Sequence, residues 1–451
     1  MRTALVLSTL AAFASAPAQA MLFDAWSKAL VHDADYQIAL TEPDIKREDH
    51  VQARSQLLPQ ISAQGSRGKA DAKITGTGPG GTTLNRNYDA NLWALQIRQP
   101  LVRPSAFYAW RSSSKRVAAS TAQLQDARQT LLANLIETMA QLQFAEASLT
   151  AAKASVLGAQ QKLSFTQRQL SAGNVTRRET AEAQTALALA QQQIAEAMLD
   201  KSTQEATWTE ITGDAQVMLP ALPADLVERL PLTESDVSKL LSQAKDKQPA
   251  ILAAMEERNA AALDVQRARS EHLPTLDLNA SRSFSESNTE NTIDTTFLTN
   301  RVDLQLTLPL FSGGATQARV RQSQARLAQA EARLDGVIAK VQSQIVRALA
   351  GLTSARQQAA SARATLEAAE VSLRSATLGI TAGTATVADK INAEADRAVA
   401  ERDKVRANVQ ALLFWSQLQQ ALGLLDDDRL RALMNALEWK EPPTQAISFG
   451  T

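Results

Sequence analysis

Two short segments of this sequence resemble each other although they lie far apart. Residues 171–179 read Ser-Ala-Gly-Asn-Val-Thr-Arg-Arg-Glu, and residues 381–392 read Thr-Ala-Gly-Thr-Ala-Thr-Val-Ala-Asp-Lys-Ile-Asn. Their glycines, Gly173 and Gly383, are 210 positions apart, and an acidic residue follows each of them six positions later. Helical patterns run into and out of both segments. Each segment is therefore predicted to be the tip of a long helical hairpin, and the chain is predicted to be built twice.

The same doubling extends to the rest of the chain. Residues 53–55 and 268–270 both read Ala-Arg-Ser, and Pro100 matches Pro309. Each half is predicted to contain a helix, a strand, a polar loop, a second strand, a long helix, the tip and a returning helix. In the first half these elements are predicted at 24–57, 60–69, 71–87, 88–101, 102–170 and 175–211. In the second half the strand, loop, strand and last two helices are predicted at 275–284, 285–296, 301–310, 315–378 and from the tip to about 422.

The long helix predicted at 102–170 carries a seam of small and apolar residues. After a first step of seven, their spacing alternates between four and three, which is typical of a coiled coil. The positions are Leu124, Leu131, Leu135, Thr138, Leu142, Ala145, Leu149, Ala152, Val156, Ala159 and Leu163.

The predicted strands alternate apolar and polar residues. The alternation is clear at 95–98 and strongest at 301–310, and Pro100 is predicted to close its strand. Strands of about ten residues are long enough to cross a bilayer when tilted. An open four-stranded sheet, however, cannot lie in lipid with bare edges. Closure requires more strands, and three chains would supply twelve.

The sequence divides into five parts. Residues 1–20 have the basic start, apolar stretch and Ala18-Gln-Ala20 ending of a secretory signal peptide; a short membrane anchor is the alternative. A first repeat at 21–211, a proline-containing linker at 212–236, a second repeat at 237–424 and a C-terminal periplasmic tail at 425–451 follow. No later segment offers the ~18 consecutive apolar residues of a membrane-spanning helix.

Composition argues against several classes of function. The chain has no cysteine and a formal net charge of zero, so disulfides, Cys–zinc sites and bulk attraction to nucleic acid are not expected. His32, His50 and His272 are scattered, and the acidic residues 426–428 are interpreted as a solvated helix start. The glycine-rich stretch within 71–87 lacks the ending of a phosphate loop. We predict no enzyme, no metal site and no cofactor.

Several motifs occur together in this doubled layout. Leu58-Pro59 and Leu273-Pro274 precede strands, Pro309-Leu-Phe-Ser-Gly-Gly314 joins a strand to a long helix, and the second tip carries Gly383 and Asp389. In this order they resemble the TolC-like outer-membrane channel family over essentially the whole chain after residue 20. The resemblance implies a mainly α fold with transmembrane β-strands. In a homotrimer, four strands per chain would close a 12-stranded β-barrel in outer-membrane lipid, continued by a long periplasmic α-helical barrel.

The resemblance also implies a gate at the hairpin tips. In the family the tunnel closes there, and two acidic positions on the second tip form rings of charge. Asp389 matches the first of these positions, and Asn392 stands at the second. Ile380 and Ala385 occupy the positions of the family's latch and cannot form its bonds.

A replacement latch and the turns complete the set of candidate residues. Glu179 matches an acidic partner on the first tip, and Arg177 or Arg178 is predicted to hold the closed state by pairing with Asp389 or Glu179. Pro100 and Pro309 are assigned to the strand-to-helix turns. Gly313 and Gly314 are predicted to allow the second of these turns.

The resemblance implies passive transport with energy supplied by partners. We expect a periplasmic adaptor (membrane fusion) protein and an inner-membrane transporter. The opening residues 22–30 are similar to those of members that serve type I protein secretion. The lipidated efflux members carry an N-terminal cysteine, and the absence of one separates this chain from them. An ABC transporter exporting protein is therefore the first interpretation. A proton-driven multidrug efflux pump is the alternative, and a soluble periplasmic coiled-coil scaffold is a third.

Overall fold

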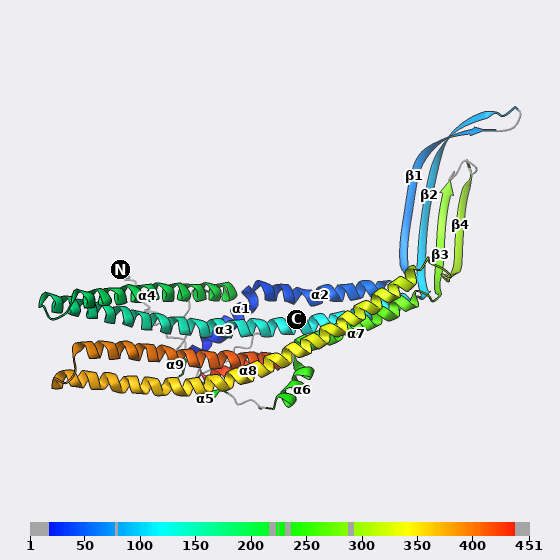
Figure 1. The fold of residues 1–451 in the computed structure, drawn as a ribbon. Helices are drawn as coiled ribbons and strands as arrows, with labels where there is room; N and C mark the ends of the chain where they lie inside the picture. Colours follow the sequence, from blue (N-terminus) through cyan, green and yellow to red (C-terminus); the bar gives the residue numbers. More distant parts are fainter. Residues whose placement is uncertain are drawn as a thin grey trace, which may run out of the picture. The chain divides into compact units, whose positions relative to one another are not determined.

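The computed structural model describes residues 18–76, 80–215, 222–223, 225–230, 236–286 and 293–437, which contain ten helices and four strands (Figure 1). The chain forms two compact units. The first comprises Met1–Leu40, Gln123–Ile251 and Ile338–Thr451, and the second comprises Thr41–Ala122 and Leu252–Val337. Of the predicted signal peptide, residues 1–17 lie outside the described residues.

The second unit contains a four-stranded antiparallel sheet with the strand order β1-β2-β3-β4. Its strands are β1 Gln60–Thr75, β2 Thr83–Val102, β3 Thr275–Glu286 and β4 Thr296–Thr307. Two helices, α2 Ala34–Ser55 and α7 Pro249–Ser270, precede β1 and β3 in the chain. The prediction of four strands per chain is confirmed, although their boundaries differ.

The prediction of a polar loop at 71–87 is wrong for most of this range. The pairing of β1 with β2 continues through it, from Asp71↔Asn87 to Thr75↔Thr83. Ala72, Ile74 and Leu84 lie on one face of this part and mostly polar side chains on the other, but this short alternation is less conspicuous than the turn-rich residues 75–81 on which the prediction depended. Ladder hydrogen bonds join backbone groups and do not require apolar side chains. Similarly, β3 and β4 enter the predicted loop 285–296 from both ends, and residues 287–292 lie outside the described residues.

The two prolines assigned to the strand-to-helix turns differ in their positions. Pro100 lies within β2, which continues to Val102 with an irregular register between these two residues. The prediction that Pro100 closes the strand is therefore wrong. In contrast, β4 ends at Thr307, before Pro309. Strand pairing explains why β2 continues past its proline and β4 does not. β3 pairs with β2 as far as Leu276, whereas β4 is an edge strand with a neighbouring strand on one side only.

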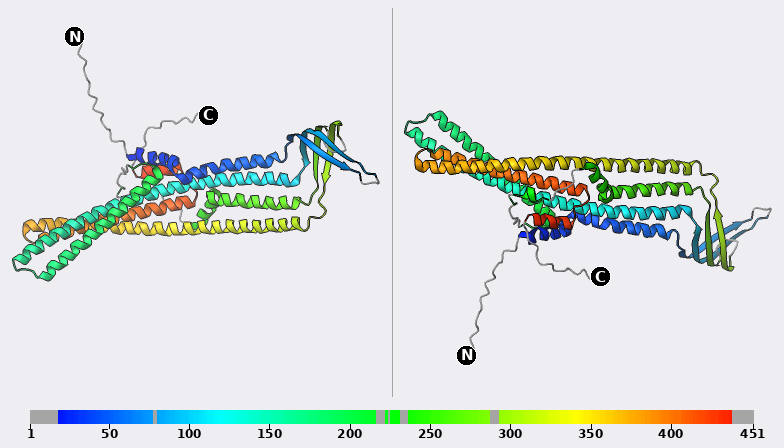
Figure 2. Two further views of the ribbon diagram at one scale, coloured as in Figure 1. Left: turned by 90° about the horizontal axis from the view of Figure 1, so that it is seen from above. Right: turned by 90° about the horizontal axis from the view of Figure 1, so that it is seen from below.

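Helices form the first unit, and α3 and α8 contribute to both units. Besides α2 and α7, the helices are α1 Ala18–His32, α3 Pro104–Ser171, α4 Arg177–Thr212, α5 Leu226–Arg229, α6 Val237–Lys247, α8 Ala315–Ala382, α9 Val387–Ala421 and α10 Asp427–Ala436. Both α3 and α8 have 68 residues, and the returning helices α4 and α9 have 36 and 35. In every view α3 lies beside α4, and α8 beside α9 (Figures 1 and 2). Among the described residues, no helix is both long enough and apolar enough to span a membrane.

The single helix predicted at 24–57 is in fact two helices. α1 ends at His32, and α2 begins two residues later at Ala34. Between them, Asp33 Oδ1 accepts a hydrogen bond of 2.7 Å from the backbone N of Tyr36. An acidic side chain that accepts from a backbone N–H three residues on starts a new helix. Apolar periodicity carries no information about such a local hydrogen bond.

The core of the first unit gathers side chains of α1, α3, α9 and α10. Trp26 and Trp415 are fully buried in it, and all eleven seam positions of α3 are buried or half-buried, which confirms the seam. Trp26 Nε1 donates to Asp427 Oδ1 at 3.1 Å, and Arg128 pairs with Asp427 Oδ2 at 2.7 Å. Residues 425–437, predicted to begin a tail, are thus partly core; 438–451 lie outside the described residues.

Two glycines of α8 have very different surroundings and test the packing of α8 on α9. A Cβ added at Gly351 would lie 2.4 Å from the Phe414 ring of α9, whereas one added at Gly336 would have no atom within 4 Å. Alanine is favoured over glycine in a helix interior by about 1 kcal/mol. We expect Gly336→Ala to raise the midpoint of thermal unfolding, followed by circular dichroism, and Gly351→Ala to lower it. Equal stabilisation by both changes would contradict the packing at Gly351.

Candidate functional site at the helical hairpin tips

The first tip joins α3 to α4 through a glycine in the left-handed conformation. Gly173 has a φ of +80°, and its N–H donates to Leu170 O at 3.0 Å, while Asn174 N donates to Gln169 O at 2.9 Å. These bonds satisfy carbonyl groups at the end of α3. Side chains add a further bond of 2.9 Å, from Asn174 Nδ2 to Gln169 Oε1.

Helix α4 then starts with a capping box. Thr176 is the N-cap residue, and its Oγ1 accepts from Glu179 N at 3.4 Å. In return, Glu179 Oε2 accepts from Thr176 N at 2.9 Å. Two backbone N–H groups that no intrahelical carbonyl can reach are satisfied in this way. The side chain of Glu179 is therefore part of the start of its own helix.

The second tip is built in the same way. Gly383 has a φ of +74°, and Thr386 is the N-cap of α9. Asp389 Oδ2 accepts from Thr386 N at 2.8 Å and from Thr386 Oγ1 at 2.7 Å. Asp389 N donates to Thr386 Oγ1 at 3.2 Å. Gly173, Thr176 and Glu179 thus have their counterparts at Gly383, Thr386 and Asp389.

These hydrogen bonds affect the titration of Asp389. The backbone and side-chain donors of Thr386 hold the pKa of Asp389 below its ordinary value, because they stabilise the charged carboxylate. Repulsion among the Asp389 carboxylates of several copies would act in the opposite direction, and it stays a prediction. Within one chain, these donors favour the charged form of the carboxylate.

Asn392 lies one turn after Asp389 on the same exposed side of α9. Both residues are exposed, while Ile391 and Ala393 are buried. Ile391 packs towards α3, since a Cβ at Gly158 would lie 3.3 Å from its Cγ2. The spacing expected for a shared face is present, and whether this face lines a tunnel stays a prediction.

Among the described residues of the single chain, neither Arg177 nor Arg178 pairs with Asp389 or Glu179, and a latch in the closed state stays a prediction. Arg178 Nε pairs with Glu182 Oε1 at 2.9 Å on its own helix, and not with Asp389 or Glu179. Four positions along a helix bring the two side chains together, and Glu179 is already engaged in capping. Arg177 is exposed, and among the described residues it has no ion pair.

A second glycine at this tip was missed in the sequence. Gly379 O accepts from Thr384 N at 2.8 Å and from Ala385 N at 3.1 Å. A Cβ at Gly379 would lie 2.7 Å from the Cβ of Ala385. Ile380 and Ala385, at the family's latch positions, here belong to the turn, because Ile380 O also accepts from Gly383 N at 3.2 Å. A glycine in the last turn of a helix was the available signal.

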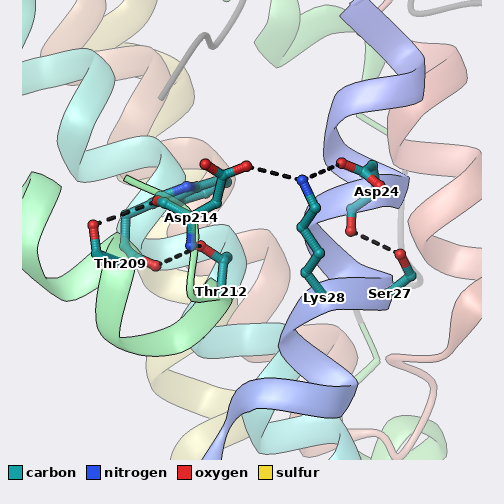
Figure 3. A network of polar contacts seen from close by, with 7 residues as sticks. Asp24, Ser27, Lys28, Thr209, Thr212 and Asp214 are labelled. Atoms are coloured by element: carbon teal, nitrogen blue, oxygen red, sulfur yellow. Dashed lines mark hydrogen bonds and ion pairs between the residues drawn. The ribbon is translucent and has the colours of Figure 1, made fainter. Parts of the chain in front are cut away.

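The end of α4 far from the tip is held by a polar network (Figure 3). Lys28 of α1 lies between two carboxylates, with its Nζ 2.7 Å from Asp24 Oδ2 and 2.8 Å from Asp214 Oδ2. These bonds raise the pKa of Lys28 to about 12, and the bond to Asp214 contributes more than the bond to Asp24. Asp214 follows Gly213, which ends α4 with a φ of +71°. The network thus attaches the end of α4 to α1.

The strand-to-helix turns differ between the halves. Gly313 and Gly314 have φ values of +61° and +81° directly before α8, a left-handed conformation that glycine adopts without a steric penalty. The first turn has one residue, Arg103, between β2 and α3. Arg103 and Arg98 both pair with Asp277 Oδ2, at 3.4 Å and 2.6 Å.

Comparison with known proteins identifies the family. A family model described as outer membrane efflux protein matches residues 25–214 and 240–424. The chain belongs to this family. The resemblance to TolC-like channels is confirmed, and the outer membrane is the location of the family. Membership also assigns the chain to transport proteins and not to enzymes.

Relatives that match this chain include two proteins named for protease secretion. The chain is 30% identical to the alkaline protease secretion protein AprF of Pseudomonas aeruginosa over 309 residues, which cover 67% of this chain and 63% of AprF. It is 28% identical to the proteases secretion protein PrtF of Dickeya chrysanthemi over 331 residues, 71% of each chain. The outer membrane protein TolC of Escherichia coli is 26% identical over 332 residues, 70% of this chain and 64% of TolC. The match thus spans less than two thirds of AprF and of TolC.

Solved structures agree in fold. The Campylobacter jejuni CmeC outer membrane channel superposes with a TM-score of 0.73 at 18% identity, over 93% of this chain and 90% of CmeC. The outer membrane protein VceC of Vibrio cholerae gives 0.72 at 19% identity, over 90% and 96%. The mostly helical fold with one four-stranded antiparallel sheet is that of these proteins.

Gly383 tests whether the shape of the tip matters for function. A Cβ there would meet no atom within 4 Å, so the cost of a substitution is confined to the backbone conformation. Valine disfavours a positive φ, whereas asparagine tolerates it. We expect Gly383→Val to impair export or gating more than assembly, and Gly383→Asn to retain both. Wild-type export by the valine variant, with normal assembly, would show that the tip conformation is not required.

The capping box of Asp389 predicts a pH dependence. Because its pKa is lowered in the folded tip, the cap stabilises the start of α9 above the ordinary aspartate pKa of about 3.9 and is lost as the pH falls through the lower folded value. Amide exchange at 387–390, corrected for intrinsic rates, should accelerate on acidification. Thr386→Val should exchange fast already at neutral pH. Constant protection across this range in the wild type would exclude the role of the carboxylate.

Proposed function

We propose that this chain is the outer-membrane exit duct of a tripartite export system. Three copies would close a 12-stranded barrel in the membrane, and their helices would continue it as a tunnel in the periplasm. Substrate would pass without energy input from this chain, from an inner-membrane transporter and its periplasmic adaptor to the outside. The observation that carries the proposal is the character of the four-stranded sheet.

One face of this sheet is apolar and uncovered. Leu304 and Val302 of β4 lie opposite Leu278 and Ala280 of β3, and the side chains of Val302 and Leu306 are 75% and 69% exposed. The ring of Trp93 lies over Gly65 on this face, where a Cβ would be 2.6 Å from the ring. Such a large exposed apolar surface is unfavourable in water and suits contact with lipid.

The opposite face of the sheet is polar. Asp303 and Arg301 alternate with the apolar residues of β4 and lie opposite Asn279 and Ser281. Asn279 Nδ2 donates to Asp303 Oδ2 at 3.2 Å. A sheet with one lipid-compatible face and one hydrated face is the pattern of a membrane barrel around water.

The edges of the sheet support association of several chains. β1 and β4 are the outer strands of the sheet (Figure 1). In lipid, the free backbone groups of such edges must find partners, so the sheet has to close on further strands. Three copies of four strands supply a closed ring of twelve.

The cargo and partners are inferred from the relatives. AprF and PrtF are named for the secretion of proteases, which supports type I protein secretion with an ABC transporter. The alternative is the channel of a multidrug efflux pump, supported by the efflux description of the family and the likeness to TolC. A soluble periplasmic scaffold has the least support, because it would leave the apolar face of the sheet in water.

A direct test combines assembly with export. The purified protein should require detergent and give the mass of three chains in native mass spectrometry. Coexpression with an ABC exporter, its adaptor and a protein substrate should give secretion that depends on this chain, whereas drug resistance restored with a proton-driven pump would support the alternative. A stable monomer without detergent would refute both.

The proposed gate predicts ion selectivity. Rings of carboxylates favour and bind cations, and Asn392 adds no charge to the face of Asp389. In planar bilayers, Asp389→Asn should reduce cation selectivity and relieve block by divalent cations, and Asn392→Asp should strengthen both. Glu179→Gln, which changes the equivalent cap of the other tip, should alter opening more than selectivity. An unchanged reversal potential in Asp389→Asn would remove Asp389 from the pore.

A further inference from the structure

Two corresponding segments of the second unit have different surroundings. Pro100 is followed by Leu101 and Val102, and its counterpart Pro309 is followed by Leu310 and Phe311. The first pair belongs to strand β2, whereas the second pair lies beyond the end of β4 at Thr307.

The two segments differ sharply in exposure. Leu101 and Val102 are 50% and 47% exposed, but Leu310 and Phe311 are each 89% exposed. Val102 is shielded by its place in the sheet, opposite Leu276 of β3. Two neighbouring large apolar side chains with almost no contacts are unfavourable in water, and they lack the cover that their counterparts have.

The strand that would provide this cover is absent from the single chain. β2 has β3 on its far side, whereas the far side of β4 is the edge of the sheet. The strand equivalent to β3 in the other half of the chain is β1, which is the opposite edge. β1 and β4 run in opposite directions, because three antiparallel pairs separate them. The free edges of β4 and of β1 from a second copy can therefore pair as β2 and β3 do.

The starts of β1 and β3 correspond in sequence and are exposed in β1. Leu58-Pro59-Gln60-Ile61 stands at the position of Leu273-Pro274-Thr275-Leu276. Ile61 lies opposite Ile97, on the apolar face of the sheet, and it is 68% exposed, whereas Leu276 is half-buried. Ile61 thus has the same position at the start of its strand as Leu276 and lies on the same face of the sheet. Leu276 has Val102 as its neighbour on the next strand, and Ile61 has no equivalent neighbour on its free edge within the chain.

We propose that residues 308–311 continue strand β4 against the start of β1 of a second copy of this chain. The shift of register that β2 shows between Pro100 and Val102 is repeated after Pro309, so that Phe311 lies against Ile61 of that copy, as Val102 lies opposite Leu276 within one chain. The inference rests on the proposed ring of copies and specifies where each copy is joined to the next at the helical end of the sheet. The partner of residues 308–311 in this proposal is a second copy of the chain. The test must exclude that Phe311 instead contacts lipid.

Cysteine cross-linking tests this contact, because the chain has no cysteine of its own. The variant Phe311→Cys with Ile61→Cys, oxidised mildly in membranes, should give covalent dimers and trimers in denaturing gels. Val102→Cys with Leu276→Cys should cross-link within one chain and leave the mass unchanged. Phe311→Cys with Ser62→Cys should not cross-link, since Ser62 lies on the other face and opposite Gln96.

The outcomes separate this contact from the proposed function. A native trimer in which the Phe311–Ile61 cysteine pair does not cross-link, and in which Phe311→Cys reacts with a lipid-phase maleimide, overturns the contact and leaves the exit duct intact. Absence of any trimer refutes both. Phe311→Ser should also lower the temperature at which the trimer dissociates, whereas Phe311→Leu should retain the wild-type value; equal loss or no loss in both would contradict an apolar contact.

Discussion

The free backbone groups along β1 and β4 are the constraint on which the rest of this structure depends. A strand at the edge of a sheet presents N–H and C=O groups that water or another strand must satisfy. Here the same sheet exposes an apolar face, so the surroundings that suit its side chains cannot satisfy its edges. The closed ring of strands that we propose would resolve this conflict, because each edge strand would then pair with a strand of another copy.

The two halves of the chain share several local structures, and they differ where their neighbours differ. Both tips combine a left-handed glycine with a threonine–acid capping box. The strand-to-helix turns, in contrast, have diverged: one is a single residue after a paired strand, and the other has two left-handed glycines after an unpaired edge. Elements that are closed within their own hairpin stay alike, and elements at the edge of the sheet do not.

The sequence predicted the features that depend on long-range periodicity. The order of the elements, the seam of α3 and the positions of both tips follow from patterns of many residues. The ribbon within 71–87 was not recognised, because its apolar alternation is confined to Ala72, Ile74 and Leu84 and the glycine-rich residues between its strands indicated a loop. The break at Asp33 depends on one local hydrogen bond to the backbone of Tyr36, and the bond between Asp427 and Trp26 depends on a partner that the tertiary fold brings close. The capping boxes, with Thr176-x-x-Glu179 and Thr386-x-x-Asp389, were readable from local spacing and were interpreted only as charges.

The capping role of Asp389 ties the electrical and mechanical properties of the tip to one side chain. An acid at this position is used for folding whether or not it faces a pore, as Glu179 illustrates in the other hairpin. Random drift to a neutral residue would loosen the first turn of α9 as well as remove a charge. Selection for a well-formed turn alone could therefore preserve acidic residues here in relatives with any cargo. In sequence comparisons, a conserved acidic residue at the tip therefore indicates first that the helical hairpin is capped. It does not by itself indicate that the residue acts on ions in a pore.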